Sequence, residues 1–115
     1  MAQPLTHDFR ETLVEQLGNK EFRRGFLGEA VNDLVEGNFA GAKAVLREYI
    51  NGTVGFIAAG KALNRSPKSL MRMLSATGNP QARNLFELIA YLQKTEGITF
   101  EVRAVKAKTS KRKAA

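Results

Sequence analysis

The sequence predicts an all-α fold, a compact bundle of about five or six helices that forms one domain over residues 8–103. Two observations favour this class. Apolar residues recur three and four positions apart in segment after segment, and Asn, Gly or Pro separates these segments. The chain has 115 residues and no Cys, so one modest hydrophobic core must hold the helices together without disulfides.

Each expected helix is bounded by residues that favour a helix end. A capping-box pattern precedes the first helix, and a Gly–Asn or Asn–Gly pair follows each of the first three. Thr53 is expected to cap the fourth helix, and Ser66 the fifth, with Pro67 at its first helical position. The segment TGNP at 77–80 then breaks the chain. The expected helices are 9–17, 20–36, 39–50, 54–63, 67–75 and 82–95.

The two ends of the chain are expected to differ from this helical body. Residues 1–7 show no periodicity and should be flexible. Residues 98–102 (ITFEV) alternate and contain β-branched side chains, which predicts a short strand that would pair with another chain or with a folded-back hairpin. Residues 104–115 are basic and poor in apolar side chains, which predicts a disordered tail.

Residues 58–75 (AAGKALNRSPKSLMRMLS) predict two short helices joined at a corner. The apolar spacing stops after Leu63 and resumes after Ser66. Gly60 lies where two helices could approach too closely for a side chain. The second helix is expected to bury Leu70, Met73 and Leu74 and to expose Lys68, Ser69, Met71, Arg72 and Ser75. That exposed face carries hydrogen-bond donors and no acid.

The charge distribution points to a polyanionic partner. The net charge is +7, and much of the excess comes from the tail. Inside the helical body, no Asp or Glu occurs between Glu48 and Glu87. A region that carries only positive charge attracts polyanions, and nucleic acid is the commonest of these. The basic residues in this interval are Lys61, Arg65, Lys68, Arg72 and Arg83.

Catalytic, metal and nucleotide sites find little support, so we expect neither an enzyme nor a cofactor. Without Cys and with His7 as the single histidine, no Cys or His ligand cluster is possible. The carboxylate pairs Glu11/Glu15 and Asp33/Glu36 have the spacing of solvated helix surfaces. Residues 55–62 (GFIAAGKA) come within one residue of a P-loop, but Ala62 lacks the magnesium-binding hydroxyl and the segment is helical.

The sequence also predicts no membrane partner. No apolar run approaches the roughly 20 residues of a membrane span, and the N-terminus lacks the pattern of a signal peptide. We therefore expect a soluble protein of the cytoplasm.

Residues 54–95 resemble the helix-turn-helix of Xre/Cro-type regulators, and more closely the addiction-module antidote proteins of the HigA-like class. The resemblance rests on SPKSLMRMLS, the GNP turn, NLFELIAYL and GITFEV, in that order, with helical segments upstream. Gly60 falls where the family usually has Ala, and Asn64 where it usually has Gly. Arg65 departs from a position that is normally apolar. The resemblance implies a lambda-repressor-like bundle with its helix-turn-helix at 54–75.

The resemblance assigns roles to three groups of residues. In this motif the second helix enters the major groove of DNA with its N-terminal residues nearest the bases. The expected base-reading residues are Ser66, Lys68, Ser69 and Arg72. The expected phosphate contacts are Thr53, Lys61, Arg65 and Arg83. A homodimer interface is expected at Phe86, Tyr91, Ile98 and Phe100, although Phe86 and Tyr91 would alternatively complete the core.

The implied function is that of an antitoxin that binds double-stranded DNA, represses its own operon and binds a RelE/ParE-type toxin. Such a protein would reside in the bacterial cytoplasm and associate with the nucleoid when bound to DNA. Two alternatives stay open. The chain would otherwise be a stand-alone DNA-binding repressor without a toxin, or a helical protein-interaction module that does not bind DNA.

Overall fold

The structure is a computed structural model that describes residues 7–107. This part of the chain is all-α, as predicted, and contains no strand. None of its helices combines the length and the apolar character needed to cross a bilayer. The expectations for residues 1–6 and 108–115 lie outside the described residues. The helices are α1 (His7–Gln16), α2 (Lys20–Val35), α3 (Phe39–Gly52), α4 (Gly55–Leu63), α5 (Pro67–Met73) and α6 (Ala82–Glu96).

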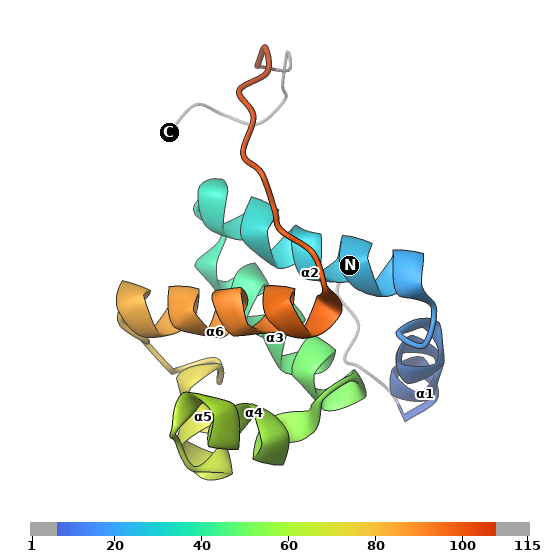
Figure 1. Ribbon diagram of the computed structural model, residues 1–115, viewed down its shortest axis with the longest axis vertical. Helices are drawn as coiled ribbons and strands as arrows, with labels where there is room; N and C mark the ends of the chain where they lie inside the picture. The colour runs from blue at the N-terminus through green and yellow to red at the C-terminus, as the bar shows by residue number, and fades with distance from the viewer. Residues whose placement is uncertain (1–6, 108–115) are drawn as a thin grey trace.

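The helices surround one hydrophobic core. α2 packs on α3, and α4 contacts α3, α5 and α6, so that α4 and α5 form one end of the bundle (Figure 1). Every helix contributes buried apolar side chains, as the periodic spacing predicted. The largest buried side chains are Leu17, Leu27, Leu46, Tyr49, Ile50, Leu70, Leu74, Leu85, Leu88 and Leu92.

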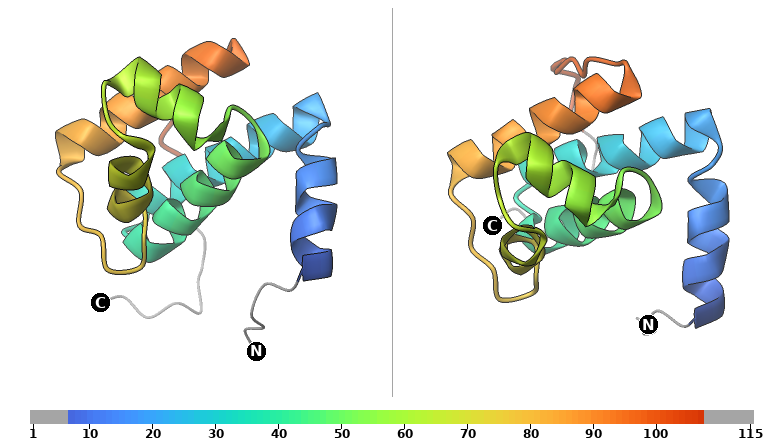
Figure 2. Two further views of the ribbon diagram at one scale, coloured as in Figure 1. Left: turned by 90° about the horizontal axis from the view of Figure 1, so that it is seen from below. Right: turned by 60° about the horizontal axis from the view of Figure 1, so that its bottom comes forward.

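The corner between α4 and α5 forms at the predicted residues (Figure 2). Asn64 ends α4 in the left-handed conformation, with φ 58°, which Asn tolerates better than most residues. Ser66 then caps α5, because its hydroxyl oxygen accepts the Ser69 N–H at 3.0 Å. Gly60 lies directly against the turn, and a Cβ there would lie 2.5 Å from the carbonyl oxygen of Arg65. The predicted close approach at Gly60 is confirmed.

Replacing Gly60 by Ala is expected to lower the free energy of unfolding by about 1–3 kcal/mol, because the new methyl group collides with backbone atoms. Gly25 in α2 is a matched control, since a Cβ added there would have no atom within 4 Å. Gly25→Ala is expected to raise the free energy of unfolding by about 0.5–1 kcal/mol through helix propensity alone. Urea denaturation of both variants measures the contrast. Equal stabilisation by the two substitutions would contradict the close approach.

The predicted strand over 98–102 is wrong for the single chain. After Gly97 ends α6 with φ 74°, residues 98–107 form neither helix nor strand. No second strand exists in residues 7–107 to pair with them, and the backbone N–H of Phe100 instead donates to Oε1 of Gln93 at 2.7 Å. The Phe100 ring packs against the core beside Gly28. The segment then leaves past α2, on the side away from α4 and α5 (Figure 1).

Candidate nucleic-acid interface

The outer face of α5 is arranged largely as the sequence predicted. Leu70 and Leu74 are fully buried, and Met73 packs partly against the core. Lys68, Met71 and Arg72 are exposed, whereas Ser69 and Ser75, which were also expected to be exposed, are half-buried. Pro67 and the Ser66 cap fix the first turn of this short helix. The helix therefore presents Lys68 and Arg72 to solvent, while Leu70 and Leu74 on its opposite side pack into the core.

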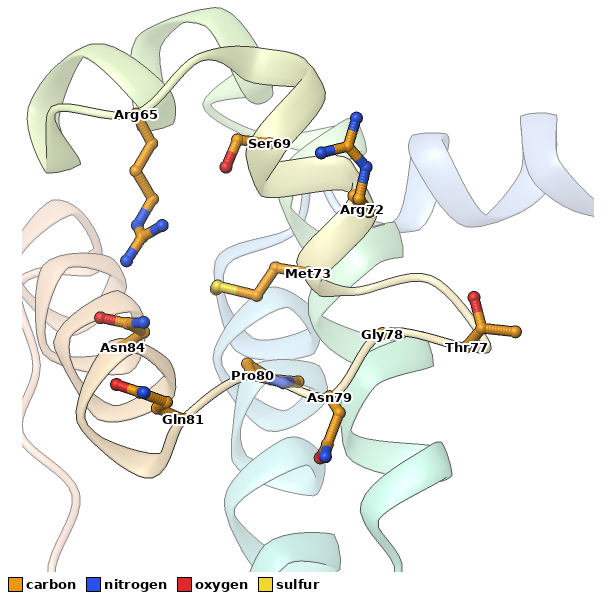
Figure 3. Close-up of a pocket in the computed structure, with 10 residues that line it drawn as sticks. All are labelled: Arg65, Ser69, Arg72, Met73, Thr77, Gly78, Asn79, Pro80, Gln81 and Asn84. Atoms are coloured by element: carbon orange, nitrogen blue, oxygen red, sulfur yellow. The ribbon is translucent and has the colours of Figure 1, made fainter.

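An open pocket of about 560 Å³ lies beside α5 (Figure 3). α5, the segment 74–81 and the first turns of α6 form its walls. The Arg65 side chain extends toward Asn84, and Asn79 and Gln81 lie on the connecting segment (Figure 3). The lining contains no acidic side chain. It consists of Arg65, Ser69, Arg72, Met73, Thr77, Gly78, Asn79, Pro80, Gln81 and Asn84.

The pocket unites predicted residues with residues that the sequence patterns did not indicate. Arg65, Ser69 and Arg72 come together there from the turn and from α5. Asn79 also lines the pocket, although the sequence predicts the TGNP segment only as a helix breaker, and Asn84 lines it from the first turn of α6. A polar turn that follows a short basic helix is the signal that would have found Asn79. We call the pocket, together with Lys68, the α5 surface.

The residues expected to contact phosphate differ in their surroundings. Thr53 does not cap α4, so that prediction is wrong: its hydroxyl donates to the Tyr49 carbonyl oxygen at 2.6 Å, one turn back in α3. Val54 precedes α4 without a side-chain cap. Lys61 is exposed on α4. Arg83 is exposed and lies 3.4 Å from the Glu87 carboxylate, a solvated pair of the kind that contributes little to stability.

The expected dimer residues divide into two groups. Phe100 is engaged within its own chain, and Ile98 is half-buried. On α6, by contrast, the Phe86 side chain is 56% exposed, and Tyr91 is only partly buried. An open pocket of about 450 Å³ lies between the end of α4 and this face of α6. Its lining is Ala62, Leu63, Asn64, Glu87, Ala90, Tyr91 and Lys94.

A buried polar cluster lies at the other end of α6. The single Nε–H of Arg23 donates a shared hydrogen bond to both oxygens of the Glu96 carboxylate, at 2.8 and 2.9 Å, and the Tyr49 hydroxyl donates another to Oε1. Burial alone would raise the pKa of Glu96, but these hydrogen bonds outweigh burial and lower it. Burial and the neighbouring carboxylate raise the pKa of Tyr49, so its hydroxyl stays protonated. The cluster links α2, α3 and α6, so we assign it a structural role.

The described residues offer no group of three or more His, Asp or Glu side chains suited to a metal ion. Comparison of the chain with protein families, with curated proteins and with solved structures found no match. The assignment of a function therefore depends on the α5 surface itself and on the sequence resemblance.

Proposed function

We propose that this protein is a sequence-specific DNA-binding transcriptional regulator that uses α4 and α5 as a helix-turn-helix. The α5 surface carries the proposal, because it places Arg65, Lys68 and Arg72 at one end of the bundle with no carboxylate among the residues that line it. Such a surface suits the phosphates and base edges of duplex DNA. A helix of seven residues is also short enough to lie within one major groove.

Different residues of this surface would supply affinity and specificity. Arg72 and Lys68 project from α5 and can donate to O6 and N7 of guanine. The Ser66 and Ser69 hydroxyls would give weaker contacts to either kind of base pair. Arg65, Lys61 and Arg83 would bind phosphates and set the orientation of the protein without reading the sequence.

Duplex titration tests the proposal. We expect the protein to bind a duplex that it selects from a random pool, with affinity that falls as salt rises. Arg72→Ala should cost about 1–3 kcal/mol on that duplex and alter the preferred sequence, whereas Arg65→Ala should weaken all duplexes alike. Lys20→Ala removes an exposed positive charge of α2 and is the matched control. Failure of the wild-type protein to bind any duplex at low salt would refute the proposal.

A homodimer is part of the proposed function, because one copy of α5 reads few base pairs. Antiparallel packing of two α6 helices about a two-fold axis between Ala90 and Tyr91 would set Glu87 opposite Lys94 of the second copy. The same register places the small Ala90 opposite Tyr91, beside the apolar pocket that ends α4. The exposed Phe86 lies on the same helix.

Charge reversal tests this dimer. Lys94→Glu is expected to weaken self-association about tenfold or more, because it would create two repulsive pairs with Glu87. The double variant Glu87→Lys/Lys94→Glu should restore the dimer, since the charges are then exchanged. Sedimentation equilibrium measures both dissociation constants. A double variant that dimerises no better than Lys94→Glu would rule out this register.

The antitoxin role depends on the resemblance of residues 54–95 and on the proposed DNA binding. In that role the protein would repress its own operon in the bacterial cytoplasm and bind a RelE/ParE-type toxin. Co-purification with the product of an adjacent toxin gene, and rescue of cells that express this product, would distinguish an antitoxin from a stand-alone repressor.

A further inference from the structure

Two basic side chains of α3 hold the chain behind the α5 surface. Lys43 is only 4% exposed, and its Nζ donates to the carbonyl oxygens of Ala76 and Gly78 at 3.2 and 2.5 Å. The Nζ atom also lies 5.4 Å from the centre of the Phe39 ring. Arg47 donates from Nη1 to the Leu74 carbonyl oxygen at 2.5 Å. Three carbonyl groups in the segment that follows α5 are therefore bound by cations of α3.

The segment after α5 needs such support. The last carbonyl groups of a helix have no partner within the helix and carry partial negative charge, which cations stabilise. Residues 74–81 form no regular structure, and Gly78 packs so tightly that a Cβ there would collide with the Arg72 carbonyl oxygen. Asn79 and Gln81 of this segment line the same pocket as Arg72. Its position relative to α5 determines the shape of the α5 surface.

We propose that Lys43 and Arg47 are positioning residues for DNA recognition. Lys43 is buried, Arg47 is half-buried, and neither residue lines the pocket; we assign the effect of their charges to the carbonyl groups of residues 74–78 that they bind. They hold this segment against the end of α5 and so fix Asn79 and Gln81 relative to Arg65 and Arg72. The inference rests on the proposed DNA-binding function and extends it to residues on the inner side of the surface.

The test separates positioning from charge. Lys43→Met keeps the length and apolar stem of the side chain but removes its donors. For this variant we expect affinity for the selected duplex to fall on the order of tenfold, as the loss of charge-assisted hydrogen bonds suggests. Affinity for DNA of mixed sequence, and the slope of log affinity against log salt, should stay unchanged because no phosphate contact is lost. Arg65→Ala, in contrast, should reduce that slope by about one.

Three further measurements keep the outcome decisive. Leu13→Ala lowers stability at α1, far along the chain from residues 74–78, and should leave the ratio of selected to mixed-sequence affinity unchanged in the folded protein. Arg47→Met should lower this ratio, and Arg47→Lys should restore it in part. These two variants decide the question if Lys43→Met does not fold. An equal loss of affinity for selected and for mixed-sequence DNA in these variants, together with a reduced salt slope, would overturn the positioning role.

Hydrogen exchange without DNA distinguishes failure of this inference from failure of the proposed function. In Lys43→Met we expect the backbone amides of residues 70–78 to exchange faster than in the wild type, while those of α2 stay the same. If exchange is faster in Lys43→Met but the wild-type protein binds no DNA, Lys43 still supports the segment after α5, and the DNA-binding function is refuted. Unchanged exchange and an unchanged affinity ratio would overturn the inference itself.

Discussion

Replacing Glu96 by Gln is expected to lower the free energy of unfolding by about 3 kcal/mol, because it removes a buried anion on which the partly buried Arg23 and the buried Tyr49 converge. The Glu96 side chain is 3% exposed and accepts hydrogen bonds from Arg23 and Tyr49. Arg24 contributes as well: its Nε lies 3.5 Å from Oε2, and its Nη2 donates to the Glu96 carbonyl oxygen at 3.2 Å. One carboxylate thus connects α2, α3 and the end of α6.

Thermal unfolding measures this loss, and a fall of about 3 kcal/mol corresponds to a shift in Tm on the order of 15 °C for a domain of this size. Glu87→Gln is the matched control. It removes an acid from the same helix, but the partner of Glu87 within the chain is the exposed Arg83, so the expected change is below about 0.5 kcal/mol at a protein concentration at which both variants are monomers. A similar loss of stability in both variants would show that the burial of Glu96 does not add to its contribution to the free energy of unfolding.

The pH dependence gives an independent check on Glu96. Its pKa is lower in the folded protein than the ordinary value of 4.5, so folding favours the ionised carboxylate. The stabilisation is therefore complete above pH 4.5 and declines as the pH falls through the lower folded pKa. Wild-type stability should drop over this acidic range, and the drop should be smaller in Glu96→Gln. Parallel pH profiles for the two proteins would contradict the lowered pKa.

The features of this fold that depend on residues close together in the sequence were predictable. Gly60, Asn64 and Ser66 act through conformations and hydrogen bonds that span a few residues, and the corner formed where they indicated. Apolar periodicity likewise identified Leu70 as buried and Arg72 as exposed on α5, because a helix of known period turns these positions in opposite directions.

Features that join distant segments were not predictable. Arg23 and Glu96 are 73 positions apart, and nothing near either residue indicates the partner. The contact of Lys43 with Gly78 is of the same kind. The strand over 98–102 was predicted from alternation alone, but a strand needs a neighbour, and the single chain provides Gln93 and Gly28 for Phe100 instead. Local pattern sets the preference of a segment, and tertiary contacts decide the outcome.

Reversing two charges of α5 is expected to have the largest effect on function. The variant Lys68→Glu/Arg72→Glu should lose at least about 100-fold in affinity for the selected duplex, because two donors become anions that face phosphates and base edges. Both side chains are exposed and lie outside the core, so the fold should persist, as circular dichroism would verify.

The matched control for this reversal is Lys20→Glu/Arg103→Glu. It changes the net charge by the same amount, but its residues lie on α2 and on the segment that leaves past α2, away from α5. We expect it to retain affinity within about fivefold, through long-range repulsion alone. Equal losses for the two variants would mean that total charge, not the α5 surface, governs binding. If neither reversal affects the cellular activity of the protein, the helical protein-interaction module becomes the better account, because that function does not need donors on α5.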